Sequence, residues 1–193
     1  MERFAATPTA SIPDACDSWS ETCAAYRFLG NDDVEWRDIL APHWAQTQVR
    51  MGTHPVVLCV QDLTELDFNG QDIEGLAPLN YEARRDMYLH ATYAVTPGRE
   101  PLGMLDAWML AREKRDAGGV RGGQKESTRW IEGYQRVAEM AAGMPDTRLV
   151  YLADREADLI EMMRCARELG NPADWLVRAK HNRCLPDEEG GKL

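Results

Sequence analysis

The sequence of 193 residues lacks long apolar runs, a secretory leader and paired cysteine motifs. A membrane-spanning helix needs about 18 or more consecutive apolar residues, and no stretch approaches that length, so no membrane span is expected. Residues 1–11 contain one arginine and no apolar segment, which is unlike a secretory signal. The five cysteines form no Cys-x-x-Cys pair. This spacing argues against a zinc site and favours free thiols in the reducing cytoplasm.

Positive charge is also scarce. Lysine and arginine number 22 against 32 acidic residues, for a net charge of −10. Proteins that bind DNA usually present a basic surface, because counterions released from the phosphates supply much of the affinity. The net charge therefore counts against nucleic-acid binding, although a local basic stripe can act whatever the total. The hydrophobic fraction of 44% is ordinary for a globular protein, so a buried core is feasible.

The chain begins with a small helical region, which we place at residues 1–54. Its first 13 residues are polar and contain prolines, and we expect them to be poorly ordered. Trp19, Cys23 and Tyr26 then recur at i, i+4 and i+7, which predicts a helix. We interpret the aromatic residues of this region as core rather than as part of a ligand site.

The sequence pattern changes at Pro55. Before it, a second amphipathic stretch runs from Val34 to Val49, and Pro42 within that stretch is expected to break or restart the helix. After it, the run Val56–Val60 is apolar, β-branched and too short for a helix. The run predicts a buried strand that ends at Asp62.

The remaining segments predict strands and helices in alternation. They are strands at 88–95 and 102–110 joined by a turn at Pro97-Gly98, a glycine-rich mobile loop at 111–124, a helix from Ser127, a strand at 149–153 ending at Asp154, a helix at 156–169 stopped by Gly170, and a last strand starting at 175–177.

This order of elements, helices and then β-β-β-α-β-α-β, predicts an α+β domain with a mixed sheet. Three strands linked as hairpins, followed by parallel strands with crossover helices, place helices on the faces of the sheet. We place this domain at residues 55–183, followed by a tail at 184–193. The arrangement resembles ribonuclease-H-like domains.

Two of the buried-type strands each end in an aspartate, Asp62 and Asp154. If these strands are parallel neighbours, their ends lie about 5 Å apart. Carboxylates that close repel each other unless a cation lies between them, and magnesium is typically held by one or two carboxylates plus substrate phosphates. Simpler interpretations remain: Asp154 precedes a helix and suits an N-cap, and Asp62 suits a turn.

Five segments resemble, in the same order, elements of the Tn-five-type (insertion-sequence-four) DDE transposases. They are Ala25-Tyr26-Arg27-Phe28 with Asn31 and Val34, Val60-Gln61-Asp62-Leu63-Thr64, Lys125-Glu126-Ser127 with Trp130, Ala153-Asp154-Arg155-Glu156-Ala157-Asp158, and Val177-Arg178-Ala179-Lys180-His181. Together these segments extend over most of the chain.

The resemblance implies a ribonuclease-H-like catalytic core in which Asp62 and Asp154 are the first two ligands of Mg²⁺ or Mn²⁺. Such enzymes nick transposon ends with water and then use the freed 3′-hydroxyl for strand transfer. The implied partners are transposon-end DNA and, in the full-length protein, a second copy of the chain. The family pattern also places a basic run against donor-DNA phosphates, although a solvated strand end explains the charges equally well. The run consists of Arg178, Lys180, His181 and Arg183.

Parts of the family pattern are absent. The third catalytic glutamate of the family follows a long β-rich insertion, and the sequence reaches Leu193 before either. Glu188 and Glu189 lie in a glycine-containing tail and are poor substitutes. The DNA-end-binding domain is expected to be missing or much shortened, since residues 1–20 contain no basic helix.

We therefore expect a transposase fragment that is inactive alone. One alternative is a non-catalytic fragment that binds DNA or intact transposase and inhibits transposition. The other is an unrelated two-aspartate nuclease or phosphatase on the same fold.

Overall fold

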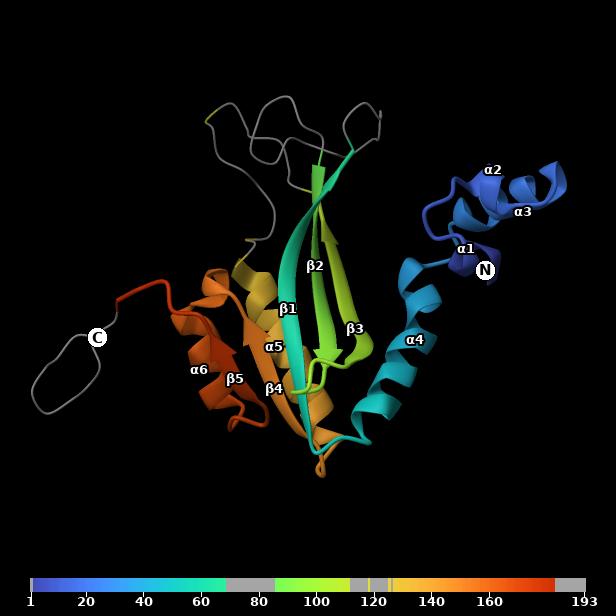
Figure 1. Cartoon of the computed structure of the whole chain (residues 1–193). Helices are drawn as coiled ribbons and strands as arrows, with labels where there is room; N and C mark the ends of the chain where they lie inside the picture. The colour runs from blue at the N-terminus through green and yellow to red at the C-terminus, as the bar shows by residue number, and fades with distance from the viewer. Residues whose placement is uncertain (1, 69–85, 112–117, 119–124, 126, 183–193) are drawn as a thin grey trace, which may run out of the picture. The chain divides into compact units, whose positions relative to one another are not determined.

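The computed structural model describes residues 2–68, 86–111, 118, 125 and 127–182 (Figure 1). The chain divides into two compact units, Met1–Pro42 and His43–Leu193. The division lies inside a helix, whereas the predicted boundary at residue 54 marks the start of the sheet. The predicted tail at 184–193 and nearly all of the predicted loop at 111–124 lie outside the described residues.

The first unit contains short helices α1 (Glu2–Ala6) and α2 (Ile12–Ala15) and the longer α3 (Trp19–Leu29). The expectation that the first 13 residues are poorly ordered is wrong, because local capping and ion pairs define these helices. Ser11 caps α2 by accepting the Asp14 N–H at 3.3 Å, and Arg3 of α1 forms an ion pair with Asp17. Ser18 caps α3, as the polar residue before an amphipathic run predicts.

Helix α4 (Trp36–Met51) continues through Pro42, contrary to the predicted break. An internal proline costs a helix about 3 kcal/mol. Contacts of the second half of α4 within the sheet unit offset this cost. Arg50 Nε donates to the Leu102 carbonyl at 2.6 Å, and the Met104 N–H donates to His43 Nε2 at 3.1 Å.

The second unit is built on a five-stranded mixed sheet in the order β3-β2-β1-β4-β5. Antiparallel pairing joins β1, β2 and β3, whereas β4 and β5 run parallel to β1. This is the predicted hairpin followed by parallel strands, so the predicted α+β class with a mixed sheet is confirmed, and the resemblance to ribonuclease-H-like domains stays a prediction. The strands are β1 (Val56–Asp67), β2 (Asp86–Val95), β3 (Pro101–Leu110), β4 (Arg148–Ala153) and β5 (Asp174–Val177).

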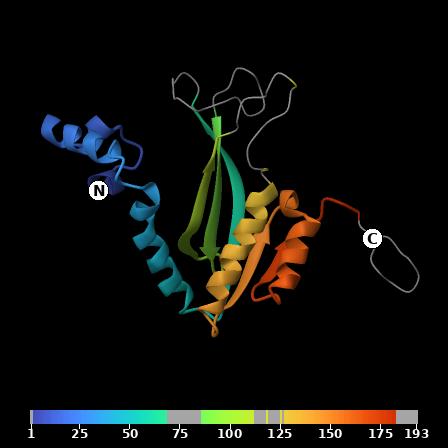
Figure 2. The same ribbon diagram turned by 180° about the vertical axis from the view of Figure 1, so that it is seen from behind.

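Helices α5 (Ser127–Ala142) and α6 (Ile160–Glu168) cover one face of the sheet, as Figure 2 shows from behind. The predicted apolar face of α5 is confirmed: Trp130, Tyr134 and Val137 are buried. Tyr134 and Val137 belong to a core to which four strands, β1 to β4, contribute. The sheet residues of this core are Val57, Cys59, Ala94, Leu102, Leu105, Leu149 and Tyr151.

The helix predicted at 156–169 is in fact two elements. A 3-10 helix, η1 (Arg155–Ala157), is followed by a break at Asp158 before α6 begins. The predicted stop at Gly170 is confirmed, since Gly170 has a φ of +80° and the Asn171 N–H returns to the Ala166 carbonyl at 2.8 Å. Among the described helices, none has the length and apolar character needed to cross a membrane.

Candidate functional site

The register of β1 and β4 places Asp62 and Asp154 at neighbouring positions. Gln61 and Ala153 are partners in the parallel pair, and the two aspartates are the next residue of each chain segment. Adjacent strands lie about 4.8 Å apart, so the paired residues from which the two aspartates follow, Gln61 and Ala153, are separated by roughly that spacing. The predicted parallel neighbourhood of these strands is therefore confirmed. A shared metal ion remains a prediction.

Both aspartates follow core-facing residues, and for Asp62, which lies within β1, this decides the face of the sheet to which it belongs. Gln61 is 1% exposed on the side of α5, whereas Asp62 is exposed. Because side chains alternate along a strand, Asp62 lies on the sheet face opposite α5. Asp154 follows Ala153, the partner of Gln61, and is likewise exposed. The pair thus lies on solvent-accessible surface rather than in the core.

Asp62 is an in-strand residue and not the end of its strand. β1 continues to Asp67, and Asp62 pairs with Ala91 of β2. Two expectations, the strand end at Asp62 and its interpretation as a turn residue, are therefore wrong. What ends near Asp62 is the pairing with β4, whose last partners are Gln61 and Ala153. The Asp62 side chain makes a local hydrogen bond, in which Oδ1 accepts the Leu63 N–H at 2.8 Å.

Asp154 is the N-cap of η1, which confirms the simpler interpretation of this residue. Its Oδ1 accepts the Glu156 N–H at 2.8 Å. A cap of this kind uses one carboxylate oxygen, and a hard cation can take the other. Capping and metal binding are therefore chemically compatible at Asp154.

A buried polar network lies directly behind the aspartates. Gln61 Nε2 donates to the Arg129 carbonyl of α5 at 3.1 Å. The Tyr151 hydroxyl lies 3.0 Å from Gln61 Oε1 and 3.1 Å from the Trp130 carbonyl. These bonds tie β1, β4 and the first turn of α5 together one residue away from Asp62. The sequence carried a signal that we missed: Gln61 is a polar residue at a core-facing position of an apolar strand.

Gly133 allows α5 to approach this network. A Cβ atom at Gly133 would lie 1.6 Å from Gln61 Oε1, well inside any real contact distance. The glycine is therefore required by close packing rather than by backbone conformation. It is one helical turn from Arg129, the residue whose carbonyl Gln61 binds.

Two groups in this region are held in their neutral forms. The pKa of the Tyr151 hydroxyl is raised, first by burial and then by the negative charge of Asp154. Burial raises the pKa of the Cys59 thiol to about 12. The layer beneath the aspartates is thus uncharged at neutral pH, and the charge of the site lies on its exposed side.

The predicted basic run passes close to Asp154. The Arg178 N–H donates to the Ala153 carbonyl at 3.2 Å, which extends the contact between β5 and β4 by one residue. Arg178, Lys180 and His181 all have exposed side chains. Arg183, the fourth predicted DNA-binding residue, lies outside the described residues.

Beyond the pair itself, the described part of the chain contains no group of three or more His, Cys, Asp or Glu residues placed to hold a metal ion. Asp62 and Asp154 therefore offer two oxygen-bearing side chains at this place. A hard divalent cation such as Mg²⁺ fits a donor set of carboxylate oxygens, and it usually completes its coordination with water and substrate phosphates.

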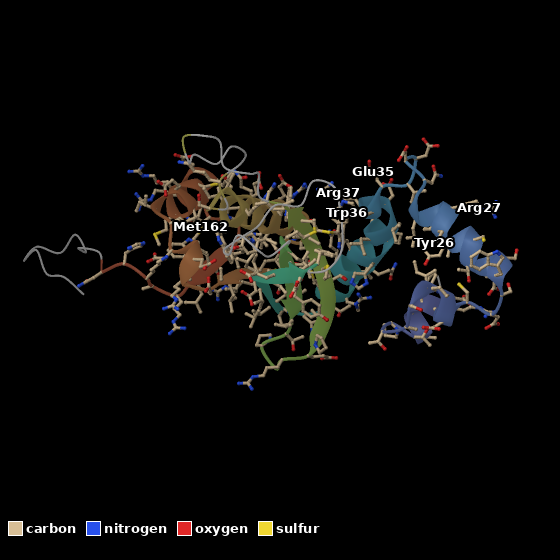
Figure 3. The ribbon with its side chains drawn as sticks, turned by 90° about the horizontal axis from the view of Figure 1, so that it is seen from above. Tyr26, Arg27, Glu35, Trp36, Arg37 and Met162 are labelled. Atoms are coloured by element: carbon tan, nitrogen blue, oxygen red, sulfur yellow. The ribbon has the colours of Figure 1, made fainter. Side chains whose placement is uncertain are left out.

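Helix α3 in the first unit exposes its aromatic residues. Trp19 is 77% exposed and Tyr26 is 52% exposed, so their interpretation as core is wrong. Figure 3 shows Tyr26 and Arg27 on this helix. A hollow of about 510 Å³ in the same unit lies between α1 and α3, with Phe4 and Phe28 in its lining.

Comparison with known proteins connects this first unit with transposases. The family model described as "Transposase DNA-binding" matches residues 1–34. The expectation was a DNA-end-binding domain that is missing or much shortened, and the match shows that a segment of this kind is present. The prediction overlooked this segment because it looked for a basic helix, whereas the matched segment has only two basic residues, Arg3 and Arg27. Its acidic residues are Glu2, Asp14, Asp17, Glu21, Asp32 and Asp33.

Among solved structures, the chain is similar to one described as "Crystal structure of a pre-cleavage Mos1 transpososome". The sequence identity is 10% and the TM-score is 0.33. The alignment covers 90% of this chain and 56% of the other, so the present chain spans little more than half the length of that protein.

Proposed function

We propose that this chain is part of a cut-and-paste DNA transposase, combining DNA-binding helices at residues 1–34 with two metal-binding carboxylates of a DDE-type catalytic core. The observation that supports the proposal is the register of β1 and β4, in which Asp62 and Asp154 each follow one member of the last paired positions, Gln61 and Ala153. The match of residues 1–34 to transposase DNA-binding segments supports it independently.

In this proposal Asp62 and Asp154 together hold Mg²⁺ or Mn²⁺. The bound cation would supply charge neutralisation at a phosphodiester and activation of the attacking oxygen. The polar network of Gln61 and Tyr151 keeps the two backbone segments in register, so that the carboxylates remain close enough to share an ion. Arg178, Lys180 and His181 contact DNA phosphates and set the position of the duplex without reading its sequence.

The proposal also states what the 193 residues do alone. A DDE-type site requires a third carboxylate, and no third ligand joins the pair within the described residues. We expect the chain to bind metal and DNA but to cut transposon-end DNA weakly or not at all. Robust Mg²⁺-dependent cutting that disappears in Asp154→Ala would contradict this expectation of inactivity.

Titration with Mn²⁺, followed by calorimetry, tests the metal site directly. Asp62→Asn and Asp154→Asn should each weaken Mn²⁺ binding by roughly tenfold or more, since even residues that only orient metal ligands contribute on this scale. Asp146→Asn is the matched control, because Asp146 is an exposed aspartate just before the opposite end of β4. Equal Mn²⁺ affinity in all four proteins would overturn the proposed site.

A non-catalytic role is the second candidate, and the same pair of carboxylates without a third favours it. A chain that binds DNA or intact transposase without cutting would compete with the active enzyme. Co-expression with the intact transposase should then lower the transposition frequency. An unchanged frequency at high expression would exclude this role.

A further inference from the structure

Asp158 is a buried carboxylate that the proposed metal site does not use. The residue is 3% exposed and lies in the break between η1 and α6, four residues after Asp154. Its Oδ2 accepts two consecutive backbone N–H groups, those of Lys180 at 2.7 Å and His181 at 2.9 Å. An ionised carboxylate is costly to bury unless it is hydrogen-bonded, and such charge-assisted bonds compensate the cost.

These bonds act on the segment that leaves β5, residues 178–181. The Arg178 N–H is already bound to the Ala153 carbonyl at 3.2 Å. With the two bonds to Asp158, the backbone of this segment is attached at three points to the chain on either side of Asp154. The side chains of Arg178, Lys180 and His181 are nevertheless exposed. The segment thus has a fixed backbone and accessible cations.

We propose that Asp158 is a positioning residue, whose carboxylate holds the backbone of residues 178–181 so that its cationic side chains meet the phosphates of a DNA duplex beside Asp62 and Asp154. This inference rests on the proposed function. A segment that is ordered before binding loses less conformational freedom when it meets the DNA. Asp158 therefore raises DNA affinity through geometry, even though its own charge repels phosphate.

Asp158 affects DNA affinity in two ways, through its negative charge and through its hydrogen bonds to the backbone of Lys180 and His181. The two effects have opposite signs, so substitutions can separate them. Removing an acidic residue lowers the negative charge of the protein, so charge alone predicts tighter DNA binding in Asp158→Ala. Loss of the two backbone bonds predicts weaker binding, because the cations are no longer held together. Asp158→Asn removes the charge but keeps an oxygen acceptor, so it should bind DNA as well as the original chain or better.

The experiment measures fluorescence anisotropy of a short DNA duplex titrated with the 193-residue chain, in EDTA and over a range of salt concentrations. We expect Asp158→Ala to weaken binding at low salt by roughly tenfold, the scale of a hydrogen bond to a charged group. The slope of log affinity against log salt should become shallower by about 1 to 2, because each lost phosphate contact contributes about 0.9.

Asp174→Ala is the charge-matched control, because it removes an exposed carboxylate at the other end of β5 that pairs with Arg148. It should bind DNA at least as tightly as the original chain. Amide hydrogen exchange gives a second readout. The Lys180 and His181 amides should be protected in the original chain and in Asp158→Asn, and should exchange fast in Asp158→Ala.

Three results would overturn the inference. The first is an Asp158→Ala chain that binds DNA with unchanged affinity and salt slope. The second is fast exchange of the Lys180 and His181 amides in the original chain, which decides the matter even if Asp158→Ala does not fold. The third is an original chain that shows no salt-dependent DNA binding. None of these measurements needs metal or cleavage, so failure of the Mn²⁺ site leaves them separately interpretable.

Discussion

The helical unit, Met1–Pro42, and the sheet unit, His43–Leu193, differ in that only the sheet unit fully buries aromatic side chains among the described residues, although it also exposes Tyr93 and Trp175. Trp19 of α3 is 77% exposed, whereas Tyr134 and Tyr151 are fully buried and pack edge to face at 5.7 Å. Both buried hydroxyls are hydrogen-bonded, that of Tyr134 to the Ala173 carbonyl at 2.9 Å. The difference shows that an amphipathic helix buries its apolar face only where a second layer is present to cover it.

The comparison indicates which unit contributes most of the free energy of unfolding. In the sheet unit, α5 and α6 pack on the sheet and form a continuous core beneath the two aspartates. The first unit contains α1, α2, α3 and the first part of α4 and no strand among its described residues, and several of its large apolar residues face solvent. We expect the free energy of unfolding to depend mainly on the sheet unit, and the exposed residues of α3 to serve surface contacts instead.

Replacing one tryptophan in each unit tests this comparison most strongly. Trp130→Ala should lower the free energy of unfolding by about 3–5 kcal/mol, because Trp130 is 2% exposed and its loss leaves a cavity beside His90. Trp19→Ala, the matched substitution, should change it by less than about 0.5 kcal/mol. Urea unfolding monitored by circular dichroism measures both. Similar losses in the two variants would mean that the units do not differ in this way.

A methyl group at Gly133 should have the next largest effect. In Gly133→Ala the new Cβ would meet Gln61 Oε1, so α5 must move away from β1 or the network must break. Overpacking of this kind typically costs about 1–3 kcal/mol, and we expect the upper end of that range. Gly143→Ala is the control, since its Cβ would lie 3.5 Å from the Met140 carbonyl oxygen. Equal stability of the two variants would contradict the close packing of α5 against Gln61.

Between pH 7 and pH 10.5, alkaline pH should weaken the sheet unit through Cys59 by at most about 2 kcal/mol, the smallest effect of the three. The thiol pKa is raised from 9.0 to about 12 by burial, so the folded chain retains a proton that the unfolded chain loses. The stability that this thiol contributes is complete below pH 9 and is lost as the pH rises towards 12, by up to about 1.4 kcal/mol per pH unit. Tyr151 adds a loss of the same sign at higher pH.

Cys59→Ala isolates this thiol in urea titrations at pH 7 and pH 10.5. The variant should be less stable at pH 7, because it leaves a small cavity. Its stability should nevertheless fall less than that of the original chain between the two pH values. Parallel losses would show that Cys59 does not titrate with unfolding.

Much of the fold was predictable from local patterns. The apolar, β-branched run at Val56–Val60, the Pro97-Gly98 turn and the helical periodicity from Ser127 each identified an element that the structure contains. The order of these elements then predicted the mixed sheet, since crossover connections favour parallel strands. The predictions that failed include the helix break at Pro42, the strand end at Asp62, the uninterrupted helix through Asp158 and the poor order of the first 13 residues.

The residues of the candidate site were likewise predictable only in part from local sequence patterns. Asp62 and Asp154 stand out in the sequence because each follows a buried-type strand. The hydrogen-bond partners of Asp158 and Gln61 could not be predicted, because they are far away along the chain: Lys180 lies 22 residues from Asp158, and Tyr151 lies 90 residues from Gln61. A hydrogen bond across that distance leaves no periodic signal in the sequence. The exposure of Trp19 was missed for a related reason, since amphipathic spacing indicates a face but not what covers it.

The sequence by itself determined where most strands and helices of this protein lie, and that Asp62 and Asp154 each come soon after an apolar, strand-like run, because those properties depend on neighbours within a few positions. Only the tertiary structure decided that Asp62 and Asp154 follow paired positions of β1 and β4. It also decided that Gln61 and Tyr151 form a hydrogen bond next to them in the core, and that the buried Asp158 carboxylate binds the backbone of the basic segment. Each of these depends on groups brought together by the pairing of β1 with β4 and of β4 with β5, which the chain achieves only on folding.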